Sequence, residues 1–494
     1  MSLIRVEHLT FAYPGSYDNV FEDMSFQIDT DWKLGLLGRN GRGKTTFLRL
    51  LQGEYAYEGR IDCPEQCAYF PPAVPGVEAM TLEILCGLCL SAEEWELLRE
   101  TGLLGVEAEA LYRPFGTLSN GERTKCLLAA LLCGEERYLL IDEPTNHLDA
   151  AGRRAVAAYL RRKRGFLLVS HDRDFLDGCV DHILAFNKTG PEVQSGSFSS
   201  WWENKERRDA FEQAENEKLR GEIKRLEQSA EERRRKADTV ERAKTGISSQ
   251  GIVKHGLQPY LGEKSRKGQQ QRKNMDRRAE RAVAEKSGLL KDLERAEELK
   301  LRSLTARGRL LDLWEVCLFY GEKQVCGPLT FSLEPGTRVA LDGSNGCGKS
   351  TLLKVLCGEK GMTYTGTVTR LPGLTISYVP QDTSFLRGSL RDYARECGVD
   401  ETLLLAILRK LDFPRVQFEK DMADWSEGQK KKALIAKSLC ESAHLYIWDE
   451  PLNYIDVWSR MQVEELLLKF RPTMLFVEHD SAFRRKVATQ VVKL

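Results

Sequence analysis

Short apolar runs and longer helical patterns alternate along most of the chain. The runs KLGLL at 33–37 and RVALD at 338–342 have the length of buried strands, and each precedes a glycine-rich loop and then a helical pattern. LLVS at 167–170 and LFVE at 475–478 are further short runs of the same kind. Strands that alternate with helices predict an α/β fold with a largely parallel sheet.

The same landmarks occur twice in the same order, which indicates an internal repeat. The loop GRNGRGKTT recurs as GSNGCGKST, LSNGE as WSEGQ, LLIDEP as YIWDEP, and SHD as EHD. Corresponding positions are separated by 305 residues at Lys44 and Lys349 and by 308 at His171 and His479. We therefore expect two tandem copies of one domain, at 1–198 and 305–494, joined by a linker at 199–304.

The linker has a different pattern from the two copies. Apolar residues follow a heptad on two arms, and glycines at 246, 251, 256 and 262 separate the arms. This pattern predicts an antiparallel helical hairpin with its tip near 244–267, although a solvated charged linker would share its composition. At a rise of 1.5 Å per residue, an arm of forty-odd residues would be about 60 Å long.

Charge is unevenly distributed along the chain. The 494 residues contain 73 Lys and Arg and 73 Asp and Glu, and therefore carry no formal net charge. The stretch from Arg233 to Arg281, here called the basic island, holds 15 basic and 5 acidic residues, so the rest of the chain carries a compensating negative charge. Because neutralising phosphates requires clustered Lys and Arg, the island is a candidate nucleic-acid-binding segment.

Length and apolar content limit the class of protein further. A chain of this length suggests roughly two to four domains. No apolar run approaches a membrane-spanning length, and the first residues have no secretory signal pattern. Thirteen dispersed cysteines suit reduced thiols. We expect a cytoplasmic protein without a membrane partner.

Two loops carry the pattern G-x-x-x-x-G-K-[ST], which is typical of nucleotide phosphate binding. Glycines allow backbone N–H groups to surround phosphates, the lysine reaches the β and γ phosphates, and the hydroxyl can bind Mg²⁺. Two matches, each after a strand and before a helix, favour ATP and Mg²⁺ as cofactors. The loop residues assigned to ATP are Gly38, Asn40, Gly41, Gly43, Lys44, Thr45 and Thr46, and Gly343, Asn345, Gly346, Gly348, Lys349, Ser350 and Thr351.

Paired acidic residues end a later strand in each copy. Asp142 and Asp449 are candidate Mg²⁺ ligands, together with Thr45, Ser350 and Gln381. Glu143 and Glu450 follow directly and are suited to orient and polarise the attacking water. His171 and His479, each placed after a strand, are candidate γ-phosphate contacts. We therefore expect the four catalytic residues Glu143, Glu450, His171 and His479.

These motifs resemble those of ATP-binding-cassette (ABC) ATPases, and DEPTNHLD at 142–149 resembles the hallmark of their ABC-F branch. The resemblance implies two tandem cassettes in a head-to-tail sandwich within one monomer. Each ATP would contact the phosphate loop of one cassette and the signature of the other. The further ATP residues that it implies are the signature residues Ser119, Gly121, Ser426 and Gly428, the D-loop residues Asp149 and Asp456, and the adenine-stacking Tyr13 and Tyr320.

Each cassette departs from the family pattern, and the two depart at different positions. Gln381 follows YVP, but Pro72 occupies the corresponding position in the first cassette, which predicts a weaker first ATP site. The second hallmark is PLNYID, with Tyr454 in place of His147, and Trp425 replaces the leucine of the second signature. The first cassette also has no inserted arm, since Pro72 to Ser119 and Gln381 to Ser426 have similar spacings.

The missing arm, the degenerate hallmark and the long linker resemble ABC-F proteins that protect bacterial ribosomes from antibiotics. This implies binding at the tRNA exit site and protection from lincosamides, pleuromutilins and streptogramin A. The implied partners are the large ribosomal subunit, rRNA and P-site tRNA, without DNA. A housekeeping ABC-F translation factor is the alternative, followed by the ATPase subunit of a transporter with separate membrane subunits.

Linker residues are candidates for contacts with RNA. Tyr260, near the predicted tip, could stack on an unpaired base or close a small apolar cluster. The basic and aromatic candidates are Arg233, Arg234, Arg235, Lys254, Tyr260, Lys264, Arg272 and Lys273.

Overall fold

The computed structural model divides the chain into two units, of which one contains both cassettes. This unit comprises Met1–Trp201 and Ala296–Leu494, and the other comprises Trp202–Arg295. The described residues are 2–15, 18–64, 66–74, 76–89, 91–133, 137–187, 190–246, 298–321, 323–359 and 362–494. The side chains of residues 230, 233–234, 236–246 and 320 are not described.

The first cassette contains a six-stranded sheet in the order β5-β6-β7-β3-β8-β9, parallel except for the β8–β9 pair. The cassette also contains a separate three-stranded antiparallel sheet in the order β2-β1-β4. The strands are β1 Leu3–Phe11, β2 Phe21–Asp29, β3 Lys33–Gly38, β4 Glu58–Asp62, β5 Cys67–Phe70, β6 Tyr138–Asp142, β7 Phe166–Val169, β8 His182–Asn187 and β9 Gly190–Ser195. The α-helices are α1 Lys44–Leu51, α2 Thr81–Leu88, α3 Glu94–Leu103, α4 Asn120–Leu131, α5 Ala150–Leu160 and α6 Arg173–Cys179.

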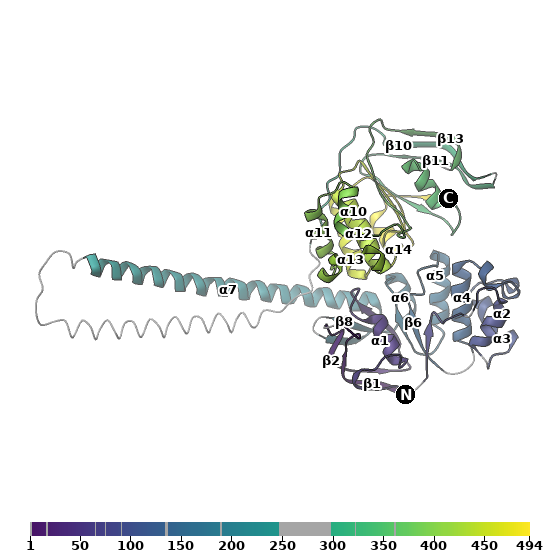
Figure 1. The fold of residues 1–494 in the computed structure, drawn as a ribbon, viewed down its shortest axis with the longest axis horizontal. Helices are drawn as coiled ribbons and strands as arrows, with labels where there is room; N and C mark the ends of the chain where they lie inside the picture. Colours follow the sequence, from purple (N-terminus) through teal and green to yellow (C-terminus); the bar gives the residue numbers. More distant parts are fainter. Residues whose placement is uncertain are drawn as a thin grey trace, which may run out of the picture. The chain divides into compact units, whose positions relative to one another are not determined.

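The second cassette repeats this arrangement with a five-stranded parallel sheet in the order β14-β15-β16-β12-β17 and an antiparallel sheet in the order β11-β10-β13. The strands are β10 Leu311–Tyr320, β11 Lys323–Leu333, β12 Arg338–Asp342, β13 Thr363–Arg370, β14 Ile376–Val379, β15 Leu445–Asp449, β16 Met474–Val477 and β17 Gln490–Lys493. The α-helices are α9 Lys349–Cys357, α10 Leu390–Glu396, α11 Glu401–Lys410, α12 Glu427–Cys440, α13 Val457–Phe470 and α14 Ser481–Val487. The predicted α/β fold with two cassettes is confirmed (Figure 1).

The central parallel strands β6, β7, β15 and β16 are apolar up to their carboxyl ends because they are buried on both faces. In β6, the four residues before Asp142 are buried, and all four residues of β7 and of β16 are buried as well. The carboxyl ends of parallel strands lie at one edge of a sheet. That edge therefore receives Gly38, Asp142 and the residue after Val169 in the first cassette.

The signature motifs begin helices through capping boxes. In α4, the Ser119 hydroxyl accepts a hydrogen bond from Glu122 N at 3.2 Å, and the Glu122 carboxylate accepts one from Ser119 N at 2.8 Å. Ser426 and Gln429 make the same exchange at the start of α12, at 3.3 and 2.9 Å. These exchanges satisfy N–H groups that a helix start leaves without intrahelical partners, so both signature serines also have a structural role.

One long helix, α7 Phe198–Gly246, leaves the first cassette (Figure 1). Its 49 residues correspond to about 74 Å at 1.5 Å per residue. Exposed pairs such as Arg235 with Glu231, at 2.7 Å, lie one turn apart along it. The predicted tip beyond 246 and the second arm up to 297 lie outside the described residues. Within the described parts of the chain, no helix is both long and apolar enough to cross a bilayer.

Candidate ATP sites

Each phosphate loop connects the end of a central strand to the start of a helix. Gly41 and Gly43 have φ of 84° and 79°, and Gly346 and Gly348 have φ of 82° and 95°. A Cβ on Gly43 would lie 2.6 Å from side-chain atoms of Phe21 and Val20, so this position also excludes any side chain. The backbone can therefore curve tightly and present its N–H groups at the helix start, as phosphate binding requires.

The loop lysines fold back over their own loops. Lys44 Nζ donates to the carbonyl oxygens of Gly38 at 2.7 Å and Arg39 at 3.2 Å. Lys349 Nζ likewise donates to Gly343 at 2.7 Å and Ser344 at 2.8 Å. Burial lowers the pKa of Lys44, while the charges of Asp456, Glu143 and Asp142 oppose this shift. The ammonium groups thus lie over the centre of each loop, close to where it would surround phosphates.

A hydroxyl and a carboxylate approach each other at the end of β6. Thr45 Oγ1 donates to Asp142 Oδ2 at 2.7 Å, which is the pairing that the sequence predicts for a Mg²⁺ site. In the second cassette, Asp449 is fully buried, and neither of its carboxylate oxygens has a hydrogen-bond partner among the described residues. Burial raises the pKa of Asp449 to about 6. A buried carboxylate of this kind fits a cation. The Ser350 hydroxyl is close enough to lower its pKa, and Ser350 and Gln381 line the same cavity.

Both glutamates adopt a backbone conformation that is uncommon for residues other than glycine. Glu143 has φ of 48° and Glu450 has φ of 47°, a region that costs on the order of 1 to 3 kcal/mol. Their N–H groups donate to Val169 O at 2.9 Å and Val477 O at 3.0 Å, which holds the turn in place. The strained turn is therefore present in both copies, where it directs a carboxylate toward the cavity.

The strand-end histidines contact these glutamates. His171 Nε2 lies 3.3 Å from Glu143 Oε1, and His479 Nε2 lies 3.2 Å from Glu450 Oε1. Burial lowers the pKa of His171, and the positive charges of Lys44 and Arg460 lower it further. A neutral His171 adds no positive charge beside Glu143, whose Oε1 has no hydrogen-bond partner among the described residues, whereas His479 and Glu450 are hydrogen-bonded.

Residues from both cassettes line each cavity. The first cavity, of about 400 Å³, brings Lys44, Asp142, Glu143 and His171 together with the second signature. The second cavity, of about 580 Å³, brings the second phosphate loop together with the first signature. The residues from the opposite cassette include Ser426, Gly428 and Tyr454 in the first cavity and Ser119, Gly121, His147 and Asp149 in the second.

Two asparagines of the phosphate loops connect the cassettes directly. Asn40 Nδ2 donates to Tyr454 O at 3.0 Å, and Asn345 Nδ2 donates to His147 O at 3.5 Å. Both acceptors are backbone carbonyls. The change from histidine to tyrosine in the second hallmark therefore preserves this contact. Tyr454 does require a φ of 64°.

The family model described as ABC transporter matches residues 21–146 and 326–453, about half of the chain. The chain belongs to the ATP-binding-cassette family, in its ABC-F branch. It is an ATPase with two ATP-binding domains.

Similar proteins span nearly the whole of this ABC-F chain. The ribosome protection protein VmlR of Bacillus subtilis is 27% identical, over 96% of this chain and 84% of that protein. The energy-dependent translational throttle protein EttA of Haemophilus influenzae is 25% identical, over 96% and 89%. The structure of an archaeal ribosome recycling factor in complex with the stalk protein aP1 is similar with a TM-score of 0.61, at 20% identity, over 96% and 84% of the two chains. This last likeness shows a shared fold.

The two ATP sites of the ABC-F protein hold their glutamates differently. Gln381 Nε2 and Asn453 Nδ2 both donate to Glu450 Oε2, at 2.9 and 2.7 Å. Burial would raise the pKa of Glu450, but the hydrogen bonds from His479 and Gln381 lower it overall. Burial raises the pKa of Glu143 to about 8, and the charge of Asp142 adds to this shift. Because Pro72 has no side-chain donor, the first site lacks the amide that Gln381 supplies to the second.

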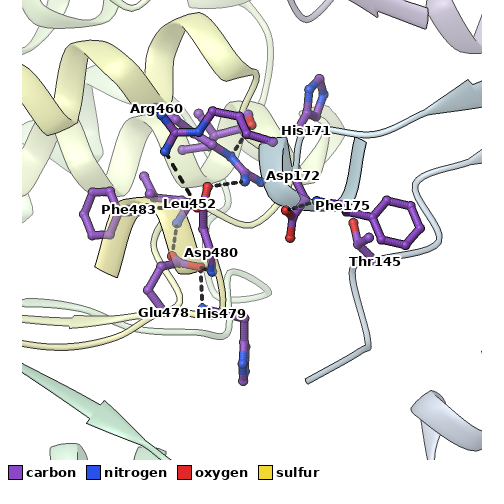
Figure 2. A network of polar contacts seen from close by, with 12 residues as sticks. Thr145, His171, Asp172, Phe175, Leu452, Arg460, Glu478, His479, Asp480 and Phe483 are labelled. Atoms are coloured by element: carbon purple, nitrogen blue, oxygen red, sulfur yellow. Dashed lines mark hydrogen bonds and ion pairs between the residues drawn. The ribbon is translucent and has the colours of Figure 1, made fainter. Parts of the chain in front are cut away.

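Buried ion pairs surround the loops that carry the two histidines (Figure 2). Asp172 accepts from Phe175 N at the start of α6, and Asp480 accepts from Phe483 N at the start of α14, both at 2.9 Å. Arg460 NH1 donates to Asp480 at 3.2 Å within the second cassette. Figure 2 shows these two helix starts, which belong to different cassettes, in one network.

Arg173 joins the cassettes within this network. Its guanidinium donates with both terminal nitrogens to Glu464 of α13 and lies 3.6 Å from Asp480. All three side chains are buried. Motif spacing did not predict this contact, because positions 173 and 464 lie outside the recurring motifs.

Three tyrosines near the ATP sites were predicted from the sequence to different degrees. The Tyr13 hydroxyl lies 2.8 Å from Thr46 Oγ1, and Tyr13 lines the first cavity. Tyr69, which the sequence analysis missed, donates its hydroxyl to Asp142 Oδ2 at 3.0 Å. Its place in YFPP, three residues before Pro72, was the available signal. The side chain of Tyr320 lies outside the described residues.

Only part of the basic island can be located. Arg235 pairs with Glu231 on α7, and Arg233 and Arg234 belong to the same helix without described side chains. The predicted contacts Lys254, Tyr260, Lys264, Arg272 and Lys273 lie outside the residues that the structure describes.

We predict that Gly428→Ala impairs ATP turnover more than Gly121→Ala. A Cβ on Gly428 would lie 2.5 Å from Tyr454 O and 2.8 Å from Asn40 Nδ2, whereas a Cβ on Gly121 would lie 3.3 Å from His147 O. Overpacking of this kind costs about 1 to 3 kcal/mol, so turnover should fall roughly five- to a hundredfold for Gly428→Ala. Steady-state ATPase rates of the two variants test this, and equal rates would show that the close approach is unimportant.

We predict that Glu450→Gln lowers turnover more than Glu143→Gln at pH 7. The reason is that Glu450 is ionised there, whereas Glu143, with a pKa of about 8, is largely protonated. In the Glu450→Gln variant, the remaining turnover should rise about tenfold between pH 7 and pH 9 as Glu143 loses its proton. In the Glu143→Gln variant, it should stay nearly constant. ATPase rates across pH measure both, and a flat profile in both variants would contradict the prediction.

Proposed function

We propose that this ABC-F ATPase binds the bacterial ribosome at the tRNA exit site. There it protects the ribosome from lincosamides, pleuromutilins and streptogramin A. It does so as a cytoplasmic monomer whose cassettes close on two ATP molecules, with the large subunit, rRNA and P-site tRNA as partners. The proposal is supported by the similarity to a ribosome protection protein over 96% of this chain, together with the basic island.

Hydrolysis in this proposal depends on the residues at the carboxyl edge of each sheet. Lys44 and Lys349 neutralise the β and γ phosphates, and Glu450 accepts a hydrogen bond from the attacking water. Thr45 and Asp142, or Ser350, Gln381 and Asp449, would hold Mg²⁺, which neutralises phosphate charge when bound. His479 and His171 keep their glutamates oriented toward the water. The signature serines of the opposite cassette close the site.

In this proposal, closure of the two cassettes moves the linker helix. The contact that transmits this movement is at the first residues of α7, within the cassette unit. Trp201 is fully buried, and its ring centroid lies 6.2 Å from that of Trp458. Trp458 is two residues after the D-loop Asp456, on α13. On the other side, Ser199 N donates to Asp177 Oδ1 of α6 at 2.8 Å. The helix root thus contacts α6 of the first cassette and α13 of the second, so a change in cassette spacing acts on the start of the helix.

A housekeeping role in translation is the second candidate. The similarity to a translational throttle protein, over 89% of that protein, favours it specifically. Both functions need ribosome binding and ATP turnover, and they differ in whether growth without antibiotic depends on the protein. A deletion strain separates them: loss of drug tolerance alone supports protection, and slow growth without drug supports the housekeeping role.

We predict that Glu143→Gln combined with Glu450→Gln keeps ATP binding and traps the protein on ribosomes. Removing both carboxylates should lower turnover by about a hundredfold or more, because each orients or polarises the water after ATP has bound. Sedimentation through sucrose with ATP should recover the double variant in the ribosome fraction. Sedimentation with membranes would favour the transporter alternative, and wild-type turnover would refute the assignment of the glutamates.

We predict that the basic island supplies much of the affinity for ribosomes. Neutralising Arg233, Arg234, Arg235, Arg272 and Lys273 should lower the slope of log affinity against log salt by up to about 4, because fewer counterions are released. A control with Arg207→Gln, Arg220→Gln and Lys224→Gln changes charges on α7 outside the island. Equal slopes for the wild type and the island variant would place the RNA contacts elsewhere.

A further inference from the structure

A groove on the first cassette combines three exposed arginines with a floor of small residues. The cavity has a volume of about 640 Å³, lies mainly between α5 and α6, and is bordered by Ser481 of α14 in the second cassette. Arg154, Arg161 and Arg162 line it, and Ala157, Ala158 and Gly178 contribute small side chains. A Cβ on Gly178 would lie 3.2 Å from Ala157 Cβ, so the close approach of the two helices restricts this position to a small residue. No ATP-site residue lines the groove.

The three arginines lie on one face of α5 and its C-terminal end. Positions 154, 158, 161 and 162 follow helical spacing, so their side chains project from the same side of the helix. Seven residues separate Arg154 from Arg161, which corresponds to about 10 Å along the axis.

The positive charge of the groove is not neutralised locally. Its two carboxylates already have other partners: Asp172 pairs with Arg153 at 2.6 Å, and Asp174 pairs with Arg485 at 2.9 Å. Among the described residues, none of Arg154, Arg161 and Arg162 has a salt bridge. Three guanidinium groups therefore remain available to bind an anion.

Equivalent positions in the second cassette show which of these arginines the cassette fold requires. With the offset of 307 that relates the D-loops, Arg153 corresponds to Arg460, and both pair with the aspartate that begins the next helix. Arg154 and Arg161 correspond to Met461 and Leu468 on α13. Arg162 corresponds to Lys469, which is also basic. The fold therefore keeps the buried arginine and does not need Arg154 or Arg161. The dipole at the end of α5 would favour Arg161 and Arg162 but not Arg154, which lies near the start of the helix.

We propose that this groove binds the phosphate backbone of RNA, as a contact site separate from the linker. Guanidinium groups form planar, two-pronged hydrogen bonds with phosphate oxygens, and small residues on the floor leave room for the backbone. Backbone contacts of this kind carry no sequence information but fix orientation. The proposal rests on the proposed function, since rRNA is then the RNA that the groove meets.

The test removes the three charges in the Glu143→Gln, Glu450→Gln background. Arg154→Gln, Arg161→Gln and Arg162→Gln should reduce the salt slope of ribosome binding by about 2 to 3. They should weaken binding at 150 mM salt while leaving the basal ATPase rate of the otherwise wild-type protein unchanged. The matched control replaces Arg409, Arg415 and Lys420 with Gln, three exposed basic residues of the second cassette.

A second arm uses a short RNA duplex in place of ribosomes. If the background protein binds no ribosomes, the proposed function fails, while the duplex still tests the groove through the same change in slope. An unchanged slope in the groove variant, or an equal change in the control variant, would overturn the RNA assignment. Competition by polyglutamate as strong as by RNA would assign the groove to acidic protein segments instead.

Discussion

Neither cassette completes an ATP site alone, and most of the structure follows from this constraint. The parallel strands deliver the phosphate loop, the carboxylates and the histidine to one edge of each sheet. The signature serine and glycine must then come from the other copy. The asparagines of the two phosphate loops donate to backbone carbonyls across the interface, at 3.0 and 3.5 Å. Because these contacts use backbone atoms, they constrain the shape of the facing loop more strongly than its side chains.

Buried ion pairs between the cassettes separate the joined state from the open state by a free-energy cost. Arg173 from one cassette lies against Glu464 and Asp480 from the other, and separation would remove its partners at once. A buried ion pair that loses one member costs about 3 to 5 kcal/mol until water replaces the partner. The same network begins beside His171 and His479, so events at either ATP site act on residues that hold the cassettes together. The root of α7 adjoins this interface through Trp201 and Trp458.

Motifs with a fixed local geometry were predictable from the sequence. The phosphate loops, the strand-end aspartates and the two-cassette α/β fold follow from spacing and from apolar runs, and the structure brings the predicted side chains together. The positive φ of Glu143 and Glu450 was not predictable, because strain depends on the surrounding hydrogen bonds. The contact between Arg173 and Glu464 was not predictable either, since 291 residues separate its partners. Tyr69 was missed although YFPP places it three residues before Pro72, because that position does not show that its hydroxyl reaches Asp142.

Duplication has allowed the two copies to diverge where symmetry is not required. Lys432 of the second signature helix binds the D-loop Asp456 at 2.7 Å, and both side chains are buried. Burial would raise the pKa of Asp456, but the charge of Lys432 lowers it strongly, so the aspartate stays ionised beside the first site. The corresponding Lys125 and Asp149 line the second cavity, and Asp149 caps α5 through Gly152 N at 2.7 Å. The D-loop that faces the first site is therefore held by a buried ion pair, while the equivalent lysine at the second site borders the nucleotide cavity. Because of this difference and the extra donors to Glu450, we expect the first site to turn ATP over more slowly than the second.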